Sequence, residues 1–385
     1  NIQFSPVYAA IENGHFEDAG LHVNIQHGDE PDGVDLIAVG NVDFGIVSGE
    51  QIIQARANER DVVFVYEWFQ KYPVGIVVPD DGDIQTVKDL AGRHVGIPGR
   101  FGASYSGLIA LLSGNDMREE DIQLEAIGYN APEVFCLGAV EAAVIYTNNE
   151  PLQIQQQADA GECGEVTGVK VFPVSDAADM VSNGIVTSNA MIQDNPERVR
   201  AVVQAFDAGL RDVINNPAEA YLLSASYVEN LPLDDDFRTA LEQEAESQSE
   251  FLATNPDRAA IAESRQRLLD RLSESFAGES LLQFEVLLAS IDLWDADQLG
   301  YTDPASWETT QQVLLTMGFI PEEIDLPAAY SNAFLPETTS ANADVVDVQA
   351  VEVADNSWTF HVTVAHPDTG WEDYANGWDV VLPDG

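Results

Sequence analysis

Short apolar runs and amphipathic stretches alternate along the first 78 residues of the chain. The apolar runs predict strands, and the stretches with three- and four-residue spacing predict helices. The alternating order favours a parallel sheet with crossover helices. The predicted strands lie at residues 2–10 (running into a helix), 21–26, 44–47 and 62–67, and the predicted helices at residues 7–16, 33–39 and 51–57.

A second unit of the same kind begins after a strand at residues 74–78 and an acidic turn, and residues 185–187 have the pattern of a strand that returns to the first unit. We therefore predict an α/β fold of two lobes. Lobe one comprises residues 1–78 and 185–336, and lobe two comprises residues 79–184. Because the chain crosses twice between the lobes, the crossings are expected to form a hinge.

The C-terminal part is mostly helical before it changes character. Residues 196–283 and 307–317 carry helical spacing, and small polar residues at 338–342 indicate a linker. Two alternating strands follow, at residues 345–353 and 358–364, so we predict a linker and a truncated β-rich domain over residues 337–385. Its aromatic residues are expected to form a small core, with a carbohydrate- or partner-binding face as the alternative: Trp358, Phe360, Trp371, Tyr374 and Trp378.

Charge narrows the choice of partners. The chain has 385 residues, of which 66 are acidic and 16 basic, for a net charge of −50. Such a surface repels nucleic acid and anionic membranes, so we expect no nucleic-acid partner. Two explanations of the charge stay open: an extracytoplasmic or salt-exposed setting, or solubility alone.

Cysteine and histidine residues give no sign of a metal site. Cys136 and Cys163 are the only cysteines, and we favour two unpaired structural thiols over a disulfide. The histidines do not cluster. The chain does not begin with Met, so we expect a further N-terminal segment, where any signal peptide would lie. No apolar run approaches the roughly 18 residues that a membrane span needs.

The chemistry-bearing region extends from Gly96 to Pro151. A strand ends at Pro98-Gly99, and a loop of small residues then opens into an apolar helix, which leaves backbone N–H groups free. A later strand, residues 142–146, ends in a cluster of polar groups. Ligands of open α/β sheets bind at the carboxyl ends of strands, so we predict a small-molecule cleft here.

Lobe two supplies five candidate ligand-binding residues. The Glu150 carboxylate can accept hydrogen bonds from the N–H edge of a nitrogen ring, or it can cap the following helix. Asn149 lies beside it, as does Tyr146, whose alternative is the core. The hydroxyls of Ser104 and Tyr105 can hold a phosphate, a sulfonate or a polar ring edge, and a plain helix N-cap is the alternative.

Lobe one supplies the other five candidates. Ser48 and Glu50 follow a buried strand and are expected to face the cleft, although Glu50 also suits the helix dipole. Trp68 follows another strand and can stack on an aromatic ligand or pack beneath a helix. Tyr8, at the first strand–helix turn, can form the second face of an aromatic sandwich. Asn183 lies at the return crossing, with turn formation as its alternative.

Five fragments, in this order and spacing, resemble the substrate-binding proteins of ABC importers in the thiamine-pyrimidine-synthase-like and nitrate-sulfonate-taurine family. The fragments are FSPVYAAIENGHFEDAGL, VDFGIVSGEQIIQARA, DLAGRHVGIPGRFGASY, VEAAVIYTNNEP and SNGIVTS…NPERVRAVVQAF. The resemblance covers about residues 1–336. It implies the type II periplasmic-binding-protein fold, in which two lobes close on a ligand.

The resemblance also implies a function. A family member of this kind is a non-catalytic, monomeric receptor that passes its ligand to an ABC permease, with no cofactor. It is extracytoplasmic, either periplasmic or lipid-anchored. The YTNNEP and GEQ fragments are most similar to the vitamin-precursor branch, which binds flat nitrogen heterocycles such as thiamine pyrimidine precursors or riboflavin.

Two other functions stay open. The first is a pyrimidine synthase of thiamine biosynthesis, whose branch of the family uses a lysine in the first lobe and a cysteine-rich run at the return hinge. This chain has no lysine before Lys71 and no cysteine at residues 181–185, so we predict no catalytic residue. The second is a sensor that uses the same two lobes to signal to a partner.

Overall fold

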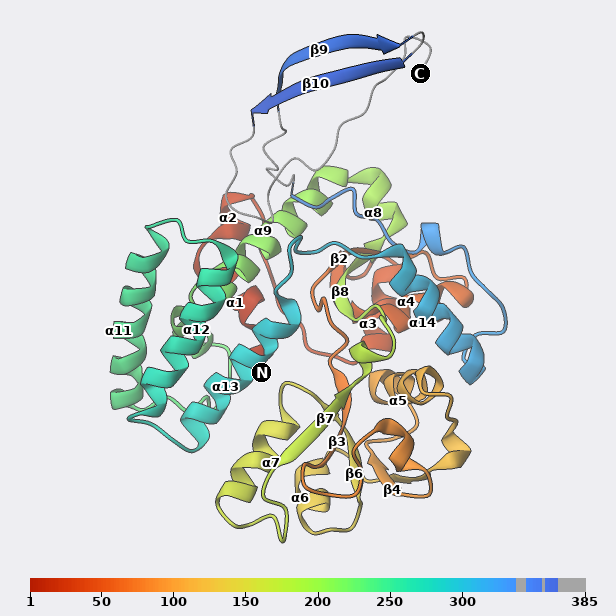
Figure 1. Cartoon of the computed structure of the whole chain (residues 1–385), viewed down its shortest axis with the longest axis vertical. Coiled ribbons are helices and arrows are strands. Elements are labelled where there is room, and N and C mark those ends of the chain that lie inside the picture. The colour runs from red at the N-terminus through yellow and green to blue at the C-terminus, as the bar shows by residue number, and fades with distance from the viewer. Residues whose placement is uncertain (337–343, 355–356, 366–385) are drawn as a thin grey trace.

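An antiparallel sheet forms the centre of lobe one, and a mixed sheet forms the centre of lobe two (Figure 1). The computed structural model describes residues 1–336, 344–354 and 357–365. In lobe one, β8 (Asn183–Ser188) runs antiparallel between β1 (Phe44–Ser48) and β2 (Val62–Glu67). The apolar pattern therefore predicts these three strands correctly. The parallel sheet expected for this lobe is wrong, because the central strand is the one that returns from lobe two.

Lobe two contains a five-stranded sheet in the order β5-β4-β6-β3-β7. Strand β4 runs parallel to β5 and β6, whereas β3 runs antiparallel to β6 and β7. The strands span Gln123–Ala126 (β5), His94–Ile97 (β4), Ala142–Tyr146 (β6), Val74–Pro79 (β3) and Val169–Pro173 (β7). Residues 74–78, which we assigned to lobe one, thus lie in the sheet of lobe two. The other domain limits stay predictions.

The N-terminal segment differs from the strand predicted for it. Ile2–Phe4 is a 3-10 turn that leads into α1 (Ser5–Glu12), and α2 (His15–Asp18) follows. Pro6 lies in the first turn of α1, where its fixed φ favours a helix start. The strand predicted at residues 21–26 is also wrong, because this segment is largely exposed and pairs with no described strand. A short apolar run does not distinguish the two kinds of element.

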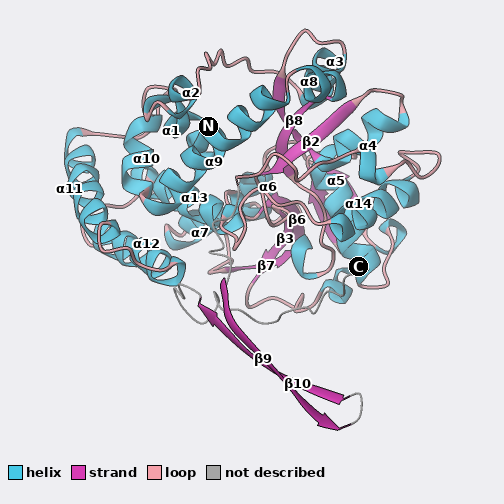
Figure 2. Cartoon of the chain, turned by 90° about the horizontal axis from the view of Figure 1, so that it is seen from above, coloured by secondary structure: helices cyan, strands magenta, loops and turns pink. Residues whose placement is uncertain are grey.

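Most helices of lobe one pack around its sheet and α1, as Figure 2 shows from above. The 20-residue helix α9 buries Val199, Val203, Phe206 and Leu210, the helical spacing that the sequence predicts. Helix α14 packs against α4 of lobe one and α5 of lobe two. The helices are α3 (Glu30–Ala38), α4 (Gly49–Ala57), α8 (Asn189–Asp194), α9 (Pro196–Asn215), α10 (Pro217–Ser224), α11 (Asp235–Leu252), α12 (Arg258–Ser273), α13 (Glu279–Trp294) and α14 (Pro304–Met317).

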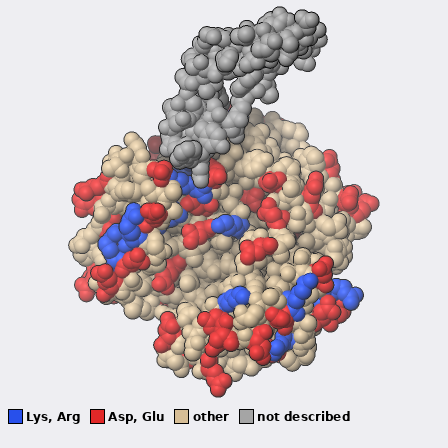
Figure 3. Space-filling view, in the orientation of Figure 1, with Lys and Arg blue, Asp and Glu red and all other residues tan. Residues whose placement is uncertain are grey.

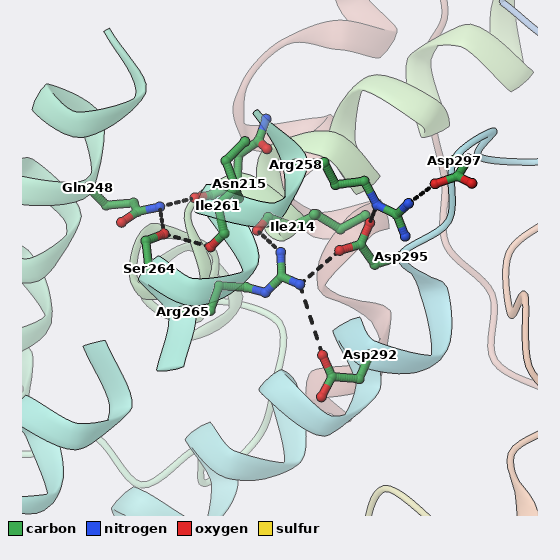
Figure 4. A network of polar contacts seen from close by, with 10 residues as sticks. All are labelled: Ile214, Asn215, Gln248, Arg258, Ile261, Ser264, Arg265, Asp292, Asp295 and Asp297. Carbon is green, nitrogen blue, oxygen red and sulfur yellow. Dashed lines mark hydrogen bonds and ion pairs between the residues drawn. The ribbon is translucent and has the colours of Figure 1, made fainter. Parts of the chain in front are cut away.

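A buried arginine ties α12 to the ends of two neighbouring helices (Figure 4). Arg265 is 5% exposed, and its guanidinium donates to the Ile214 carbonyl (3.2 Å) and to Asp295 Oδ2 (2.8 Å). Arg258 Nε donates to the other oxygen of Asp295 at 2.7 Å. Asp295 caps the end of α13. The network therefore holds the end of α13 in place.

Lobe two has three α-helices and a disulfide. The helices are α5 (Gly102–Gly114), α6 (Ala131–Cys136) and α7 (Glu150–Asp159). Cys136 and Cys163 form a disulfide, so the prediction of unpaired thiols is wrong. The two cysteines pack in one apolar cluster with Phe135 and Ile154, which brings together residues 27 positions apart. Sequence spacing alone does not carry that geometry.

The two crossings between the lobes lie side by side. The backbone N–H groups of Trp68 and Phe69 both donate to the Asn183 carbonyl, at 3.0 and 3.1 Å. The Gln70 N–H donates to the carbonyl of Leu293, near the end of α13 (2.9 Å). The hinge segments are therefore joined to each other and to the helical layer of lobe one.

The last described element is a hairpin. Strands β9 (Asp344–Ala354) and β10 (Ser357–Ala365) pair antiparallel, which confirms the two strands predicted there. Trp371, Tyr374 and Trp378 lie outside the described residues, and nothing is described of the side chains of Trp358 and Phe360. The aromatic core of this segment stays a prediction.

Acidic side chains are scattered over the whole face shown in Figure 3, and the fewer basic ones lie beside them. None of the helices in the described ranges is both long and apolar enough to cross a membrane.

Candidate ligand-binding cleft

A cleft of about 820 Å³ lies between the lobes and contains most of the predicted site residues. Ser48, Trp68 and Asn183 line it from lobe one. They are placed by the end of β1, the end of β2 and the start of β8.

The opposite wall comes from the strand and helix ends of lobe two. Ser104, Tyr146, Asn149 and Glu150 line this side. Tyr146 ends β6, and Glu150 begins α7. The structure thus gathers seven of the ten candidates at one cavity, at the ends of strands where α/β sheets bind ligands.

The other three candidates do not line the cleft. Tyr8 is 3% exposed and lies on α1, where its ring stacks on Tyr227 at 4.6 Å between centroids. Tyr105 lies on α5 and donates its hydroxyl hydrogen to Glu119 Oε2 at 2.5 Å. Glu50 is fully buried beneath the cleft. The predicted place of Tyr8 is wrong because no strand precedes its helix.

Glu30 is the central polar residue of the lobe-one wall, and it is not among the candidates predicted from the sequence. Its Oε2 accepts from the Ser48 N–H (3.1 Å) and the Ser48 hydroxyl (2.6 Å), and its Oε1 accepts from Asn183 Nδ2 (2.9 Å). Glu30 is the first residue of α3, where the helix dipole favours a carboxylate. The sequence Asp29-Glu30-Pro31 before a helical stretch could have indicated that Glu30 lies at a helix start.

Glu50 and Tyr72 connect the two lobes beneath the cleft. Burial, with the charge of Glu30 as a second cause, raises the pKa of Glu50 to about 7. The Tyr72 hydroxyl lies 3.2 Å from Glu50 Oε1 and 3.2 Å from the Ala103 carbonyl of lobe two. Because Tyr72 has one hydroxyl hydrogen, a protonated Glu50 can donate to Tyr72 while Tyr72 donates to Ala103.

Glu150 is held by the backbone of the strand before it. Its Oε2 accepts from the Tyr146 N–H at 3.0 Å. Burial raises the pKa of Glu150 and of the Tyr146 hydroxyl. The capping role and the ligand role of Glu150 are compatible, since each carboxylate oxygen has two lone pairs.

Aromatic side chains line both walls but differ in exposure. Trp68 is 2% exposed, and its ring centroid lies 5.6 Å from Phe4, 4.9 Å from Phe69 and 5.3 Å from Trp294. Phe101 and Tyr129 of lobe two are 58% and 76% exposed. Both line the cleft, and neither is among the candidates predicted from the sequence.

The start of α5 opens onto the cleft, as the loop of small residues predicts. No side chain caps this helix, and its first turn contains no acidic residue. Gly102 supplies the positive φ (61°) at the turn, and Ser104 is 6% exposed. The free N–H groups can donate to an acceptor on a ligand.

No Lys, Arg or His side chain is among the residues that line the cleft, whereas Asp29, Glu30 and Glu150 are. Within the part of the chain that is described, no group of three or more His, Cys, Asp or Glu residues is placed to hold a metal ion. The wall chemistry is therefore carboxylate, amide, hydroxyl and aromatic.

Two α/β lobes with a ligand-sized cleft at their hinge define a type II periplasmic-binding-protein fold, as the sequence resemblance implies. The sulfonate-binding protein SsuA of Escherichia coli has this fold with a TM-score of 0.59 at 15% identity, over 86% of this chain and 96% of its own. A sulfonate-binding protein of Methylobacillus flagellatus aligns with a TM-score of 0.56, also at 15% identity, over 86% of each chain. The chain belongs to the NMT1/THI5-like family, whose model matches residues 1–220.

Curated relatives extend the match along the chain. The riboflavin-binding protein RibY of Chloroflexus aurantiacus is 28% identical over 344 residues, which are 87% of this chain and 83% of RibY. A formylaminopyrimidine-binding protein of Halalkalibacterium halodurans is 25% identical over 59% of this chain and 68% of its own. A 4-amino-5-hydroxymethyl-2-methylpyrimidine phosphate synthase of Legionella pneumophila is 19% identical over 88% of this chain and 90% of its own.

Proposed function

We propose that this protein is the substrate-binding protein of an ABC importer and that it captures a small planar nitrogen heterocycle, such as a thiamine pyrimidine precursor or riboflavin. The observation that carries the proposal is the cleft between the lobes, which combines aromatic side chains with carboxylates held in place by hydrogen bonds. Two relatives of this chain, RibY and the formylaminopyrimidine-binding protein, are named for ligands of this kind.

Ligand capture works by closure. The lobe-one wall offers Glu30 to the N–H edge of the ring, and the lobe-two wall offers Glu150, the start of α5 and the exposed rings of Phe101 and Tyr129. A ligand that contacts both walls binds the closed state more tightly than the open state and so shifts the population towards it. Hydrogen bonds from Trp68 and Phe69 to the Asn183 carbonyl join the two hinge segments, so we expect these segments to move together during closure.

An extracytoplasmic location accompanies this function. The disulfide of lobe two agrees with it, because disulfides persist in oxidising surroundings. A membrane permease is the implied partner, with the protein acting as a monomer that is periplasmic or lipid-anchored. The strongly acidic surface suits a secreted or salt-exposed protein.

The relatives named as pyrimidine phosphate synthases keep an enzymatic function as the second candidate. A Schiff base needs an amine at the site, and no lysine lines the cleft. Thiolate chemistry needs a free cysteine, and both cysteines are held in the disulfide. The residues present therefore favour binding over catalysis.

A thermal-shift screen followed by calorimetry tests the proposal. The panel comprises riboflavin, thiamine, formylaminopyrimidine, aminopyrimidine precursors, taurine and nitrate. We expect a flavin, thiamine or pyrimidine to raise the melting temperature by mass action. Glu150→Ala should then weaken binding by about 1–3 kcal/mol. The exposed Glu322, which does not line the cleft, provides the matched control Glu322→Ala. Binding of taurine or nitrate alone would contradict the proposal.

A further inference from the structure

We propose that the cleft selects a planar nitrogen ring that carries N–H donors and no anionic group, so that phosphorylated forms of the ligand are rejected. This inference rests on the proposed function. It adds the charge class of the ligand and the residues that select it, which the fold does not specify.

The first step is the charge of the lining. Asp29, Glu30 and Glu150 line the cleft, and no basic side chain does. The guanidinium of Arg100 is close in sequence, but its Nε donates to Glu119 at 2.9 Å, and Arg100 is outside the lining. A phosphate or sulfonate entering this cavity meets like charges with no neutralising side chain.

The second step is that hydrogen bonds fix the orientation of the Glu30 carboxylate, so that it stays directed at the cleft when an anion enters. Three hydrogen bonds, two from Ser48 and one from Asn183, hold both of its oxygens. These bonds occupy both lone pairs of Oε2 and leave one lone pair free on Oε1, so Glu30 can still accept an N–H from a ligand through Oε1. A carboxylate fixed in this way binds a ligand edge that carries N–H donors and repels a ligand group that can only accept hydrogen bonds.

Helix N-termini are the features of the cleft that attract an anion. Helix α5 begins there without a side-chain cap, and α3, α4 and α7 begin at or directly after the lining residues Glu30, Ser48 and Glu150. Each N-terminus is equivalent to roughly half a positive charge, so the four together stay below the three negative charges of the lining. A neutral acceptor, such as a ring carbonyl or a ligand hydroxyl, can use the same N–H groups without that repulsion. The N-terminus of α5 therefore orients a neutral ligand, and it does not offset the repulsion between the carboxylates and an anionic ligand.

The third step concerns ligand shape. Phe101 and Tyr129 of lobe two line the cleft and are 58% and 76% exposed, whereas Trp68 of the other wall is packed within its own aromatic cluster. The Phe101 ring lies directly against Gly99, where a side chain would collide with it. A flat ring ligand can cover the exposed rings of Phe101 and Tyr129 when the lobes close, and aromatic stacking favours such a ligand.

The experiment compares matched ligand pairs on the wild-type protein. Dissociation constants for riboflavin and flavin mononucleotide, and for thiamine and thiamine monophosphate, are measured by calorimetry at constant ionic strength. We expect the phosphorylated member to bind at least ~10-fold more weakly. Raising the salt concentration from about 0.05 to 1 M should narrow the ratio, because salt screens charge repulsion.

Variants separate the cleft from the overall charge of the protein. Glu30→Gln and Glu150→Gln should each bring the dissociation constants of the phosphorylated and unphosphorylated ligands closer together. Glu322→Gln changes the net charge of the protein by the same amount and should leave the ratio of these dissociation constants unchanged. The salt series on wild-type protein keeps the inference testable should Glu30→Gln fold poorly.

A ratio near one, or tighter binding of the phosphorylated member, overturns the inference while leaving the proposed function intact. A large ratio that Glu322→Gln narrows as much as the cleft variants do also overturns it, since net charge would then be the cause. Failure of every flavin, thiamine and pyrimidine to bind overturns the proposed function, and this inference with it.

Discussion

The two walls of the cleft are built in opposite ways. The lobe-one wall is buried and hydrogen-bonded: Trp68 is 2% exposed, and Ser48 and Asn183 hold Glu30. The lobe-two wall presents Phe101 and Tyr129, which are more than half exposed, and a helix start without a side-chain cap. One wall is therefore preorganised, and the other is completed by ligand and closure.

This difference assigns separate tasks to the walls. Preorganised groups lower the ordering cost of binding and set which ligand is recognised. Exposed rings make few contacts in the open state and gain contacts with the ligand on closure, so they shift the population towards the closed state. Changes in the first wall should thus affect folding and binding together, and changes in the second should affect binding alone.

The largest contrast compares one aromatic residue from each wall. Trp68→Ala removes the centre of a packed aromatic cluster and should lower the free energy of unfolding by about 3–5 kcal/mol. Phe101→Ala should lower it by less than about 1 kcal/mol and still weaken ligand binding. Urea denaturation and calorimetry on both variants measure the two effects. Equal losses of stability would remove the distinction between the walls.

The disulfide tests whether lobe two depends on covalent support. Replacing both Cys136 and Cys163 by serine should lower the free energy of unfolding by about 2–4 kcal/mol, because a cross-link over 27 positions restricts the unfolded chain. Wild-type protein under reducing conditions is the matched sample. A melting temperature that is the same in both redox states speaks against the pairing.

Glu50 gives the preorganised wall a pH dependence with a defined sign. Folding raises its pKa from 4.5 to about 7, so the folded protein binds a proton that the unfolded chain releases. This contribution to the free energy of unfolding is fully present below about pH 4.5 and is lost as the pH rises through 7. Its size is on the order of 3 kcal/mol. Unfolding curves at pH 5.5 and 8.5 for wild type and Glu50→Gln check it. The variant should show the smaller pH dependence, and equal dependence would exclude Glu50 as the source.

The smallest contrast compares one asparagine from each wall. Asn183→Ala removes the amide that donates to Glu30 and should cost about 1–2 kcal/mol of stability. Asn149→Ala removes only a contact with Gln153 at the edge of lobe two and should cost less than about 0.5 kcal/mol. Chemical denaturation of the pair is the measurement, and the reverse order would show that the lobe-two wall is the more rigid one.

How far the sequence predicts the site depends on the distance along the chain over which each contact forms. The strand ends at Ser48, Trp68 and Tyr146 follow from local apolar periodicity, and so does the open helix start near Ser104. The aromatic residues Phe101 and Tyr129 carry no local signal, because exposure at a cavity is a property of both lobes. Tyr8 illustrates the reverse case, in which a suitable side chain packs against Tyr227 instead.

The sequence by itself determined the family, the α/β character and the run of small residues that opens α5, because each is encoded within a few tens of neighbouring residues. Only the tertiary structure decided that Glu30 meets Asn183 across 153 positions and that Cys136 meets Cys163. The physical reason is that β8 returns antiparallel between β1 and β2, which places Asn183 beside the start of α3 after the chain has passed through lobe two. Within lobe two, the packing of α6 against α7 brings the two cysteines into one apolar cluster.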